Sequence, residues 1–439
     1  MKGKYKIVTF GCQMNVHESE KAAGLLEEMG YAPTESAEDA DVVLFNTCCI
    51  RDTAEKRAFG NIGALKSLKR SRSGMLIIVL GCMTEQDGYT ELFKSKYPFV
   101  DIVLGTRNLS VLRAKIEEKV RAGKRVFDTA VPENFLEADE NTPVTRTSYP
   151  NAWLNIMYGC NNFCSYCIVP YVRGREVSRD IESILSEARE VVAAGYKEIT
   201  LLGQNVNSYN GNGVNFAELL QKIDQIEGKF RIRFMTSHPK DFNEEIAAVM
   251  AASSKICNGI HLPVQAGSNA VLKSMNRRYT REKYLSLVDM MREKLGEGVG
   301  ITTDIMVGFP GETDADFNDT MELVRTVRFS NAFTFIYSPR KGTPAASMPQ
   351  IPYEVKRARI GELIKLQNAI TKELSDAYMG KIEEILIEDL SAKYDGSVCG
   401  RTESGRLVTV KGEKDLIGSF KTVEITASKS ASLFGEILL

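Results

Sequence analysis

Three cysteines stand close together in one short stretch, at Cys160, Cys164 and Cys167, with the spacing C-x3-C-x2-C. The apolar run from Trp153 to Met157 before them predicts a buried strand, so the cysteines occupy the loop that follows it. A closed structural zinc site takes four protein ligands, and this loop offers three. Iron–sulfur clusters are held by thiolates. We therefore interpret the loop as the site of a cubane iron–sulfur cluster with one open iron; a zinc loop or buried free thiols are the alternatives.

Three more cysteines follow short apolar segments in the first third of the chain. The predicted strands here are Lys4–Phe10, Val42–Phe45, Met75–Leu80 and Val100–Leu104, and the predicted helices are Glu18–Met29, Arg51–Lys69 and Leu109–Ala122. This alternation predicts an open parallel sheet with helices on both faces.

Cys12, Cys48 and Cys82 each come just after one of these strands. The carboxyl ends of parallel strands share one edge, where ligands bind, so we expect the three thiols to converge and hold a second cluster. Cys49 is an alternative to Cys48 as the ligand. Cys48 is preferred because it directly follows the Asn-Thr turn. The alternative is that each cysteine is a small residue packed in a turn.

The middle of the chain repeats strand and helix behind the cysteine loop. The predicted strands are Trp153–Met157, Glu198–Leu202, Phe230–Met235, Gly259–Val264, Gly300–Val307 and Ala332–Tyr337. They predict a partial parallel (β/α)6 barrel, whose chemistry lies at the carboxyl ends of its strands. Gln204, Ser237 and Gln265 stand at those ends and predict a cofactor pocket, the alternative being turn residues that satisfy backbone groups.

The sequence pattern changes in the last sixty residues. Short alternating strands separated by glycines, from Ile382–Glu388 to Leu433–Ile437, predict a small antiparallel β-barrel. Residues 378–439 hold 8 Lys and Arg against 10 Asp and Glu, which is a slightly acidic balance. Binding of RNA by this barrel would therefore require its basic residues to lie on one face, namely Lys393, Arg401, Arg406 and Lys411. The other basic candidates for RNA contact are Arg173, Arg175 and Arg179, then Arg277, Arg278 and Arg281, then Lys66, Lys69, Arg70 and Arg72.

Composition predicts a globular protein with several domains. The 439 residues carry a net charge of −1, so no overall basic field indicates nucleic acid. No apolar run reaches bilayer length, and the nine cysteines accompany no secretion signal, which favours reduced thiols and the cytoplasm. The expected domains are 1–126, a polar linker over 127–150, then 151–378 and 379–439.

The cysteine loop, with Tyr166 before its last cysteine, resembles the signature of the radical S-adenosylmethionine (SAM) enzymes. Gly11-Cys12-Gln13-Met14-Asn15, Asn46-Thr47-Cys48 and Gly81-Cys82 resemble the N-terminal domain of the methylthiotransferases within that superfamily, and the final barrel resembles the TRAM module, which grips RNA in relatives. The resemblance continues through Gly203–Tyr209, Thr236–Lys240 and His261–Gln265 and covers essentially the whole chain.

The resemblance implies a 4Fe–4S cluster on Cys160, Cys164 and Cys167, whose open iron binds SAM, and an auxiliary cluster on Cys12, Cys48 and Cys82 that supplies sulfur. We expect both triads to face one cavity. Tyr166, Gln204, Ser237 and Gln265 are the candidates for contact with SAM.

Among the methylthiotransferase subfamilies, Gln13-Met14-Asn15 together with Arg51, Ala54 and Glu55 resembles the MiaB type. That resemblance implies methylthiolation at C2 of N6-isopentenyladenosine at position 37 of tRNA, with SAM as both radical source and methyl donor. The implied partners are the anticodon stem-loop and an electron donor such as flavodoxin or ferredoxin, with no membrane.

The alternatives are a methylthiotransferase for threonylcarbamoyladenosine tRNA or a ribosomal protein, a radical-SAM enzyme whose second cluster only transfers electrons, and a nonenzymatic zinc-stabilised RNA-binding module.

Overall fold

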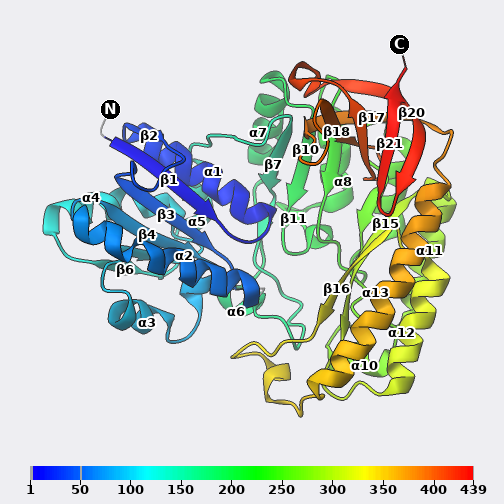
Figure 1. Ribbon diagram of the computed structural model, residues 1–439, viewed down its shortest axis with the longest axis horizontal. Helices are drawn as coiled ribbons and strands as arrows, with labels where there is room; N and C mark the ends of the chain where they lie inside the picture. The colour runs from blue at the N-terminus through cyan, green and yellow to red at the C-terminus, as the bar shows by residue number, and fades with distance from the viewer. Residues whose placement is uncertain (1–2, 50–51, 439) are drawn as a thin grey trace. The chain divides into compact units, whose positions relative to one another are not determined.

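The structure is a computed structural model that describes residues 3–49 and 52–438, without the side chains of 52–54 (Figure 1). Arg51 lies outside this description, as does the side chain of Ala54. The chain forms two compact units. The first contains residues 3–147, 158–161 and 167–177, and the second contains residues 148–157, 162–166 and 178–438, within the described ranges.

The first unit is built on a six-stranded parallel sheet. Its order is β2 (Tyr31–Pro33), β1 (Gly3–Thr9), β3 (Val42–Thr47), β4 (Leu76–Gly81), β5 (Ile102–Leu104) and β6 (Val126–Asp128). The predicted parallel sheet is confirmed. The edge strands β2 and β6 were not predicted, because Tyr31–Pro33 ends in a proline and Val126–Asp128 ends in an aspartate, so neither forms an apolar run.

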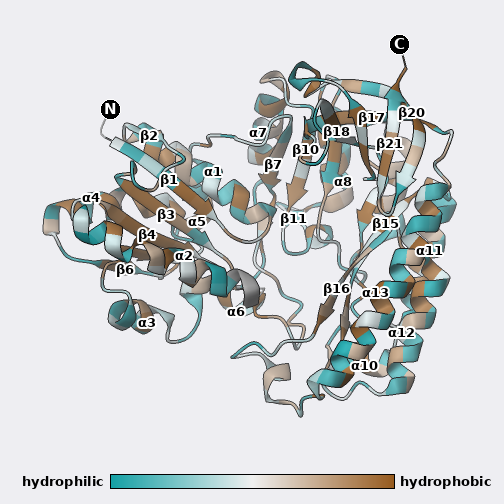
Figure 2. Ribbon diagram, in the orientation of Figure 1, coloured by the Kyte–Doolittle hydropathy of each residue, from teal (hydrophilic) through white to brown (hydrophobic). Residues whose placement is uncertain are grey.

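Helices cover both faces of this sheet. α1 (Gln13–Glu28) and α4 (Leu112–Ala122) bury Leu26 and Ile116 against one face, where Leu44 also points. α2 (Asp52–Ser71) and α3 (Tyr89–Lys96) cover the other face, with Phe45 beneath them. Burial of both faces explains why β3 is apolar from Val42 to Phe45 and β4 from Leu76 to Leu80 (Figure 2).

The strand order reverses between β1 and β3. β1 connects to β2 on one side, and the chain then returns to place β3 on the other side of β1. Such a reversal opens a crevice at the carboxyl ends of the two strands, where open α/β sheets bind their ligands. The short elements of this unit are η1 (Cys82–Glu85), η2 (Leu109–Val111), α5 (Phe135–Glu140) and α6 (Val169–Val172).

The second unit contains a partial (β/α)6 barrel, as predicted. One parallel sheet joins β7 (Asn151–Asn155), β10 (Glu198–Leu202) and β13 (Arg231–Phe234), and the other joins β14 (Gly259–His261), β15 (Gly300–Val307) and β16 (Asn331–Ile336). An isolated bridge joins Ile232 of β13 to Ile256, three residues before β14 begins.

Helices surround this partial barrel. They are α7 (Ile181–Ala193), α8 (Phe216–Asp224), α9 (Glu244–Ala252), α10 (Asn269–Ser274), α11 (Arg281–Leu295), α12 (Asp314–Val327) and α13 (Tyr353–Asp376). Minor elements are β8 (Met157–Tyr158), β9 (Val177–Ser178), η3 (Val206–Ser208), β11 (Asn210–Gly211), β12 (Val214–Asn215) and η4 (Pro344–Ser347).

The chain ends in a closed five-stranded barrel. Its order is β17 (Ile382–Leu390), β18 (Ser397–Arg401), β19 (Leu407–Lys411), β21 (Ser432–Ile437) and β20 (Phe420–Lys429), with η5 (Lys414–Leu416) before β20. The prediction of an antiparallel barrel is right except for one pair: β19 and β21 run parallel. A closed ring of five strands cannot alternate direction all the way round, so one parallel pair is required.

This small barrel packs against the amino ends of the larger barrel's strands. Arg233 donates to the carbonyl oxygens of Thr402 and Glu403, at 2.7 and 2.9 Å. A Cβ on Gly300, the first residue of β15, would lie 2.2 Å from the Ser404 carbonyl oxygen. The carboxyl ends of the strands, where chemistry is expected, are therefore at the opposite end of the strands from this contact.

Among the described residues, no helix is both long and apolar enough to span a lipid bilayer.

Candidate iron–sulfur and SAM sites

The thiols of the first unit follow the carboxyl ends of three neighbouring strands. Cys12 is the N-cap of α1 after β1, Cys48 and Cys49 follow β3, and Cys82 begins η1 after β4. Cys12 is exposed and the other three are buried. The sheet thus brings these cysteines to one edge, as the sequence predicted, with Cys12 toward solvent.

Two asparagines tie the strand ends together. Asn15 donates to the Phe10 and Thr47 carbonyl oxygens at 2.9 and 3.0 Å, and to the Asn46 side chain at 3.1 Å. Asn46 in turn donates to the Asn15 carbonyl oxygen at 2.8 Å. The asparagines of the two motifs therefore fix the loops that carry Cys12 and Cys48.

Two glycines allow these loops to approach. A Cβ on Gly81 (φ +104°) would lie 2.4 Å from the Thr47 carbonyl oxygen, and one on Gly11 (φ +120°) would lie 2.8 Å from the Cys48 Cβ. Both positions need glycine for the positive φ and for the space. The Gly-Cys pairs of the sequence are thus the turns that place Cys12 and Cys82 beside the Asn-Thr-Cys segment.

Cys49 is a close neighbour of Cys82. A hydrogen bond from the Cys49 thiol and the nearby Arg173 guanidinium outweigh burial and lower the pKa of Cys82 to about 7. The same hydrogen bond, together with burial, raises the pKa of Cys49. Cys48 instead lies against Gly11, next to Cys12. Ligation by Cys48 stays a prediction.

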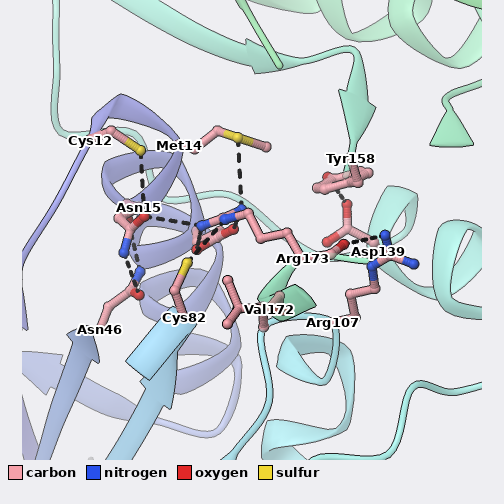
Figure 3. A network of polar contacts seen from close by, with 12 residues as sticks. Cys12, Met14, Asn15, Asn46, Cys82, Arg107, Asp139, Tyr158, Val172 and Arg173 are labelled. Carbon is pink, nitrogen blue, oxygen red and sulfur yellow. Dashed lines mark hydrogen bonds and ion pairs between the residues drawn. The ribbon is translucent and has the colours of Figure 1, made fainter. Parts of the chain in front are cut away.

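A buried arginine completes this group of residues. Arg173, 5% exposed, donates Nε–H to the Cys82 Sγ at 3.1 Å, and its other nitrogens reach Glu18 and Asn15 (Figure 3). The prediction that Arg173 contacts RNA is wrong, because its side chain is buried. Its place six residues after Cys167 was the only available signal.

The segment that follows Cys167 belongs to the first unit. Ile168 and Val172 pack in one buried cluster with Cys49 and Cys82. The Cys160 N–H donates to the Gly174 carbonyl oxygen at 3.1 Å. Two cysteines of the radical-SAM motif, Cys160 and Cys167, therefore lie in the unit that holds Cys12, Cys48 and Cys82.

Cys164 lies in the second unit and has its own buried arginine. Arg277 is 4% exposed and donates Nη1–H to the Cys164 Sγ at 3.5 Å. Its Nη2 reaches the Pro263 carbonyl oxygen at 2.7 Å and its Nε reaches the Tyr279 hydroxyl at 2.9 Å. Asn276 donates to the Phe163 carbonyl oxygen at 2.9 Å. The Asn276-Arg277 pair therefore holds the cysteine loop at the exit of β14.

The four candidates for SAM contact all lie after the strands or on the cysteine loop. Ser237 is 2% exposed and its Oγ has no hydrogen-bond partner among the described residues. Gln265 is 7% exposed with φ +70°, an uncommon conformation for a non-glycine residue. Gln204 is half-buried, and Tyr166 packs beside Tyr337 and other apolar residues. Their contact with SAM remains a prediction.

His238 is a neutral imidazole at this rim. Burial, followed by the charges of Arg277, Lys240 and Arg278, lowers its pKa to about 2. The Lys240 N–H donates to Nδ1 at 3.2 Å, so the ring proton is on Nε2, which has no partner among the described side chains. The rim thus presents a hydroxyl at Ser237 and an N–H at His238.

Several basic residues proposed for RNA contact are internal. Arg179 donates to the Asn155 carbonyl oxygen at 2.6 Å and pairs with Glu187, and Arg277 holds Cys164. Arg406, expected on the exposed face of the small barrel, is buried and donates to Ser375 at 3.2 Å. Arginine patterns in sequence do not separate solvated faces from buried hydrogen-bond donors, which is why these expectations were wrong. Arg175, Arg278, Lys393, Arg401 and Lys411 are exposed.

The residues fit iron–sulfur clusters in their donor chemistry. Each triad supplies three thiols and one buried arginine that donates to a sulfur, and such hydrogen bonds tune iron–sulfur clusters. Within the described residues, no three Cys, His, Asp or Glu side chains converge on a single metal-ion position.

Comparison with known protein families matches three parts of the chain. Residues 4–105 match the uncharacterized protein family UPF0004, residues 154–324 match the radical SAM superfamily, and residues 376–438 match the TRAM domain. A tRNA-2-methylthio-N(6)-dimethylallyladenosine synthase of Clostridium botulinum (strain Langeland) is 49% identical over 438 residues, covering 99% of this chain and 97% of that protein. The chain belongs to the MiaB-type radical-SAM methylthiotransferases.

Other relatives of this family agree over the full length. The enzyme of the same name from Carboxydothermus hydrogenoformans is 49% identical over 99% of both chains, and that of Thermoanaerobacter sp. (strain X514) is 49% identical over 100% of this chain and 94% of its own. Membership of this MiaB-type family implies a 4Fe–4S cluster, SAM and a tRNA substrate.

Solved structures share the fold at low identity. The radical SAM methyltransferase TsrM from Kitasatospora setae superposes with a TM-score of 0.58 and 15% identity over 79% of this chain and 74% of that one. The cobalamin-dependent radical SAM enzyme OxsB superposes with a TM-score of 0.54 and 12% identity over 83% of this chain and 56% of that one. Both therefore support the architecture of this methylthiotransferase and nothing finer.

Proposed function

We propose that this protein adds a methylthio group to C2 of N6-isopentenyladenosine at position 37 of tRNA in the cytoplasm. The observation that carries the proposal is 49% identity along the whole chain to enzymes named for this product, in a chain that retains both cysteine triads. The gathering of Cys12, Cys48 and Cys82 at the carboxyl ends of β1, β3 and β4 supports a second cluster in the first unit.

The six cysteines divide into two ligand sets. Cys160, Cys164 and Cys167 would hold the radical-SAM cluster, and Cys12, Cys48 and Cys82 the auxiliary cluster. When bound, the radical-SAM cluster would supply an electron to SAM, and the auxiliary cluster would supply the sulfur.

The chain's own residues prepare these sites. Arg277 fixes the Cys164 sulfur against the exit of β14, and Ser237 and His238 offer unsatisfied donors at the same rim. Gln204, Gln265 and Tyr166 would contact SAM from neighbouring positions. Because buried polar groups are normally hydrogen-bonded, the open donors at Ser237 and His238 favour a polar ligand here.

The tRNA partner must present one adenosine to both sites. An unstacked base in a loop meets this need, since its edge is free to enter a pocket. The anticodon stem-loop is the proposed ligand, and a small electron-transfer protein such as flavodoxin or ferredoxin is the proposed reductant.

The test compares Cys12→Ala with Cys399→Ala, a change at a half-buried thiol of the terminal barrel. Each variant is incubated anaerobically with SAM, reductant and isopentenylated tRNA, and nucleosides are analysed by mass spectrometry. We expect Cys12→Ala to release 5′-deoxyadenosine without the methylthio nucleoside, and Cys399→Ala to make both. Methylthio product from Cys12→Ala would contradict the sulfur-supplying role.

The same assay separates the alternatives. A wild-type protein that releases 5′-deoxyadenosine but never the methylthio nucleoside would favour a second cluster that only transfers electrons. Product on threonylcarbamoyladenosine tRNA or on a ribosomal protein, and none on isopentenylated tRNA, would reassign the substrate.

A further inference from the structure

All three guanidinium nitrogens of Arg173 donate hydrogen bonds within the first unit. Nε–H donates to the Cys82 Sγ at 3.1 Å, Nη1 to the Glu18 carboxylate at 2.7 Å, and Nη2 to the Asn15 side-chain oxygen at 3.1 Å (Figure 3). A second bond joins Nη2 to Glu18 at 3.3 Å. The side chain is therefore held by a two-point contact with Glu18.

This geometry needs an arginine and a buried carboxylate. A planar guanidinium can meet a carboxylate with two nitrogens and still direct Nε–H elsewhere, whereas a lysine ammonium cannot. Glu18 is 6% exposed on α1, the helix that Cys12 caps. Glu18 and Asn15 thus orient the guanidinium, and the Cys82 sulfur receives the donor that remains.

We propose that Arg173 is a positioning residue for the auxiliary cluster: it orients the Cys82 sulfur for ligation and raises the reduction potential of the cluster, while Glu18 opposes that effect. This inference rests on the proposed auxiliary cluster. Reduction adds negative charge, so a hydrogen bond to a ligand sulfur and a nearby positive charge favour the reduced state. The carboxylate of Glu18 is a negative charge at the same site and disfavours it.

The competing explanation is that Arg173 only anchors the segment after Cys167. Arg107 provides the matched control, because it donates to the carbonyl oxygens of Arg173 and Arg175 and has no hydrogen bond to a cysteine among the described residues. An anchoring role predicts that Arg107→Gln and Arg173→Gln behave alike.

The experiment uses the full chain with Cys160, Cys164 and Cys167 all changed to Ala, so that only the auxiliary cluster can form. Iron and sulfide are counted after anaerobic reconstitution, and the potential is measured by a redox titration followed by electron paramagnetic resonance. We expect Arg173→Gln to shift the potential to more negative values and Glu18→Gln to shift it to more positive values. Arg107→Gln should leave it unchanged.

Arg173→Lys covers the case in which Arg173→Gln binds no cluster. It keeps the charge and loses the two-point contact, so we expect a negative shift of the potential relative to the parent protein. This shift should be smaller than that of Arg173→Gln where that variant also binds a cluster. The proposal would be overturned if Glu18→Gln and Arg173→Lys shifted the reduction potential in the same direction. It would also be overturned if both variants left the potential unchanged. A parent protein that binds no iron or sulfide would instead refute the auxiliary cluster, and the role of Arg173 with it.

Discussion

Ile168, the residue directly after Cys167, packs in the same buried cluster as Cys82. Neighbouring Cα atoms are about 3.8 Å apart and packed side chains approach within about 4.5 Å, which places Cys167 and Cys82 on the order of 10 Å apart. One residue of each predicted ligand set is thus within short range of the other, inside the first unit.

We expect this proximity to be visible in the fully reduced, reconstituted enzyme. Two paramagnetic clusters at such a range interact, so the electron paramagnetic resonance spectrum should be broader than the sum of its parts. The parts are measured on two variants, one with alanines at Cys12, Cys48 and Cys82 and one with alanines at the other triad. A wild-type spectrum equal to that sum would show that the two clusters are far apart.

The choice between Cys48 and Cys49 is open to a direct test in the protein that lacks the radical-SAM cysteines. We expect Cys48→Ala to lose most of the auxiliary iron and Cys49→Ala to retain it, because Cys48 lies beside Gly11, the residue before Cys12. Iron and sulfide analysis after reconstitution gives the answer. The reverse pattern would make Cys49, the neighbour of Cys82, the ligand.

Contact between the two barrels of the second unit depends on a glycine. Gly300→Ala places a methyl group 2.2 Å from the Ser404 carbonyl oxygen, so the two barrels must separate or strain. We expect a loss of about 1–3 kcal/mol in stability, the usual cost of overpacking. Gly298→Ala is the control, because a Cβ there meets nothing within 4 Å. Thermal unfolding of the two full-length variants measures the difference, and equal melting temperatures would contradict it.

Glu388 makes the terminal barrel sensitive to pH. Burial raises the pKa of its carboxyl to about 7, partly offset by Arg401. The folded state then binds a proton more tightly than the unfolded state, so stability falls as pH rises from the ordinary glutamate range through about 7. The slope is at most about 1.4 kcal/mol per pH unit.

Glu388→Gln should remove that slope. We expect the melting temperature of the variant to exceed that of the wild type by more at about pH 8 than at about pH 5. The exposed Glu413, changed in the same way, should give no such difference. Parallel pH profiles for wild type and Glu388→Gln would contradict the raised pKa.

The sequence by itself determined the parts of this protein that follow local rules. The spacing of Cys160, Cys164 and Cys167 needs no fold to indicate a cluster loop, and apolar strands followed by Gly-Cys or Asn-Thr-Cys predict thiols at one sheet edge. Apolar runs also located most strands within a few residues, because parallel strands buried on both faces are largely apolar without alternation.

Only the tertiary structure decided which charges are buried and what they contact. Arg173 and Arg277 look in sequence like members of basic clusters, and the fold turns both inward onto cysteine sulfurs. The short strands β2 and β6, the parallel pair β19 and β21, and the burial of Arg406 likewise depend on partners far away along the chain. Burial and hydrogen bonding are pairwise properties of the folded chain, so no local pattern could supply them.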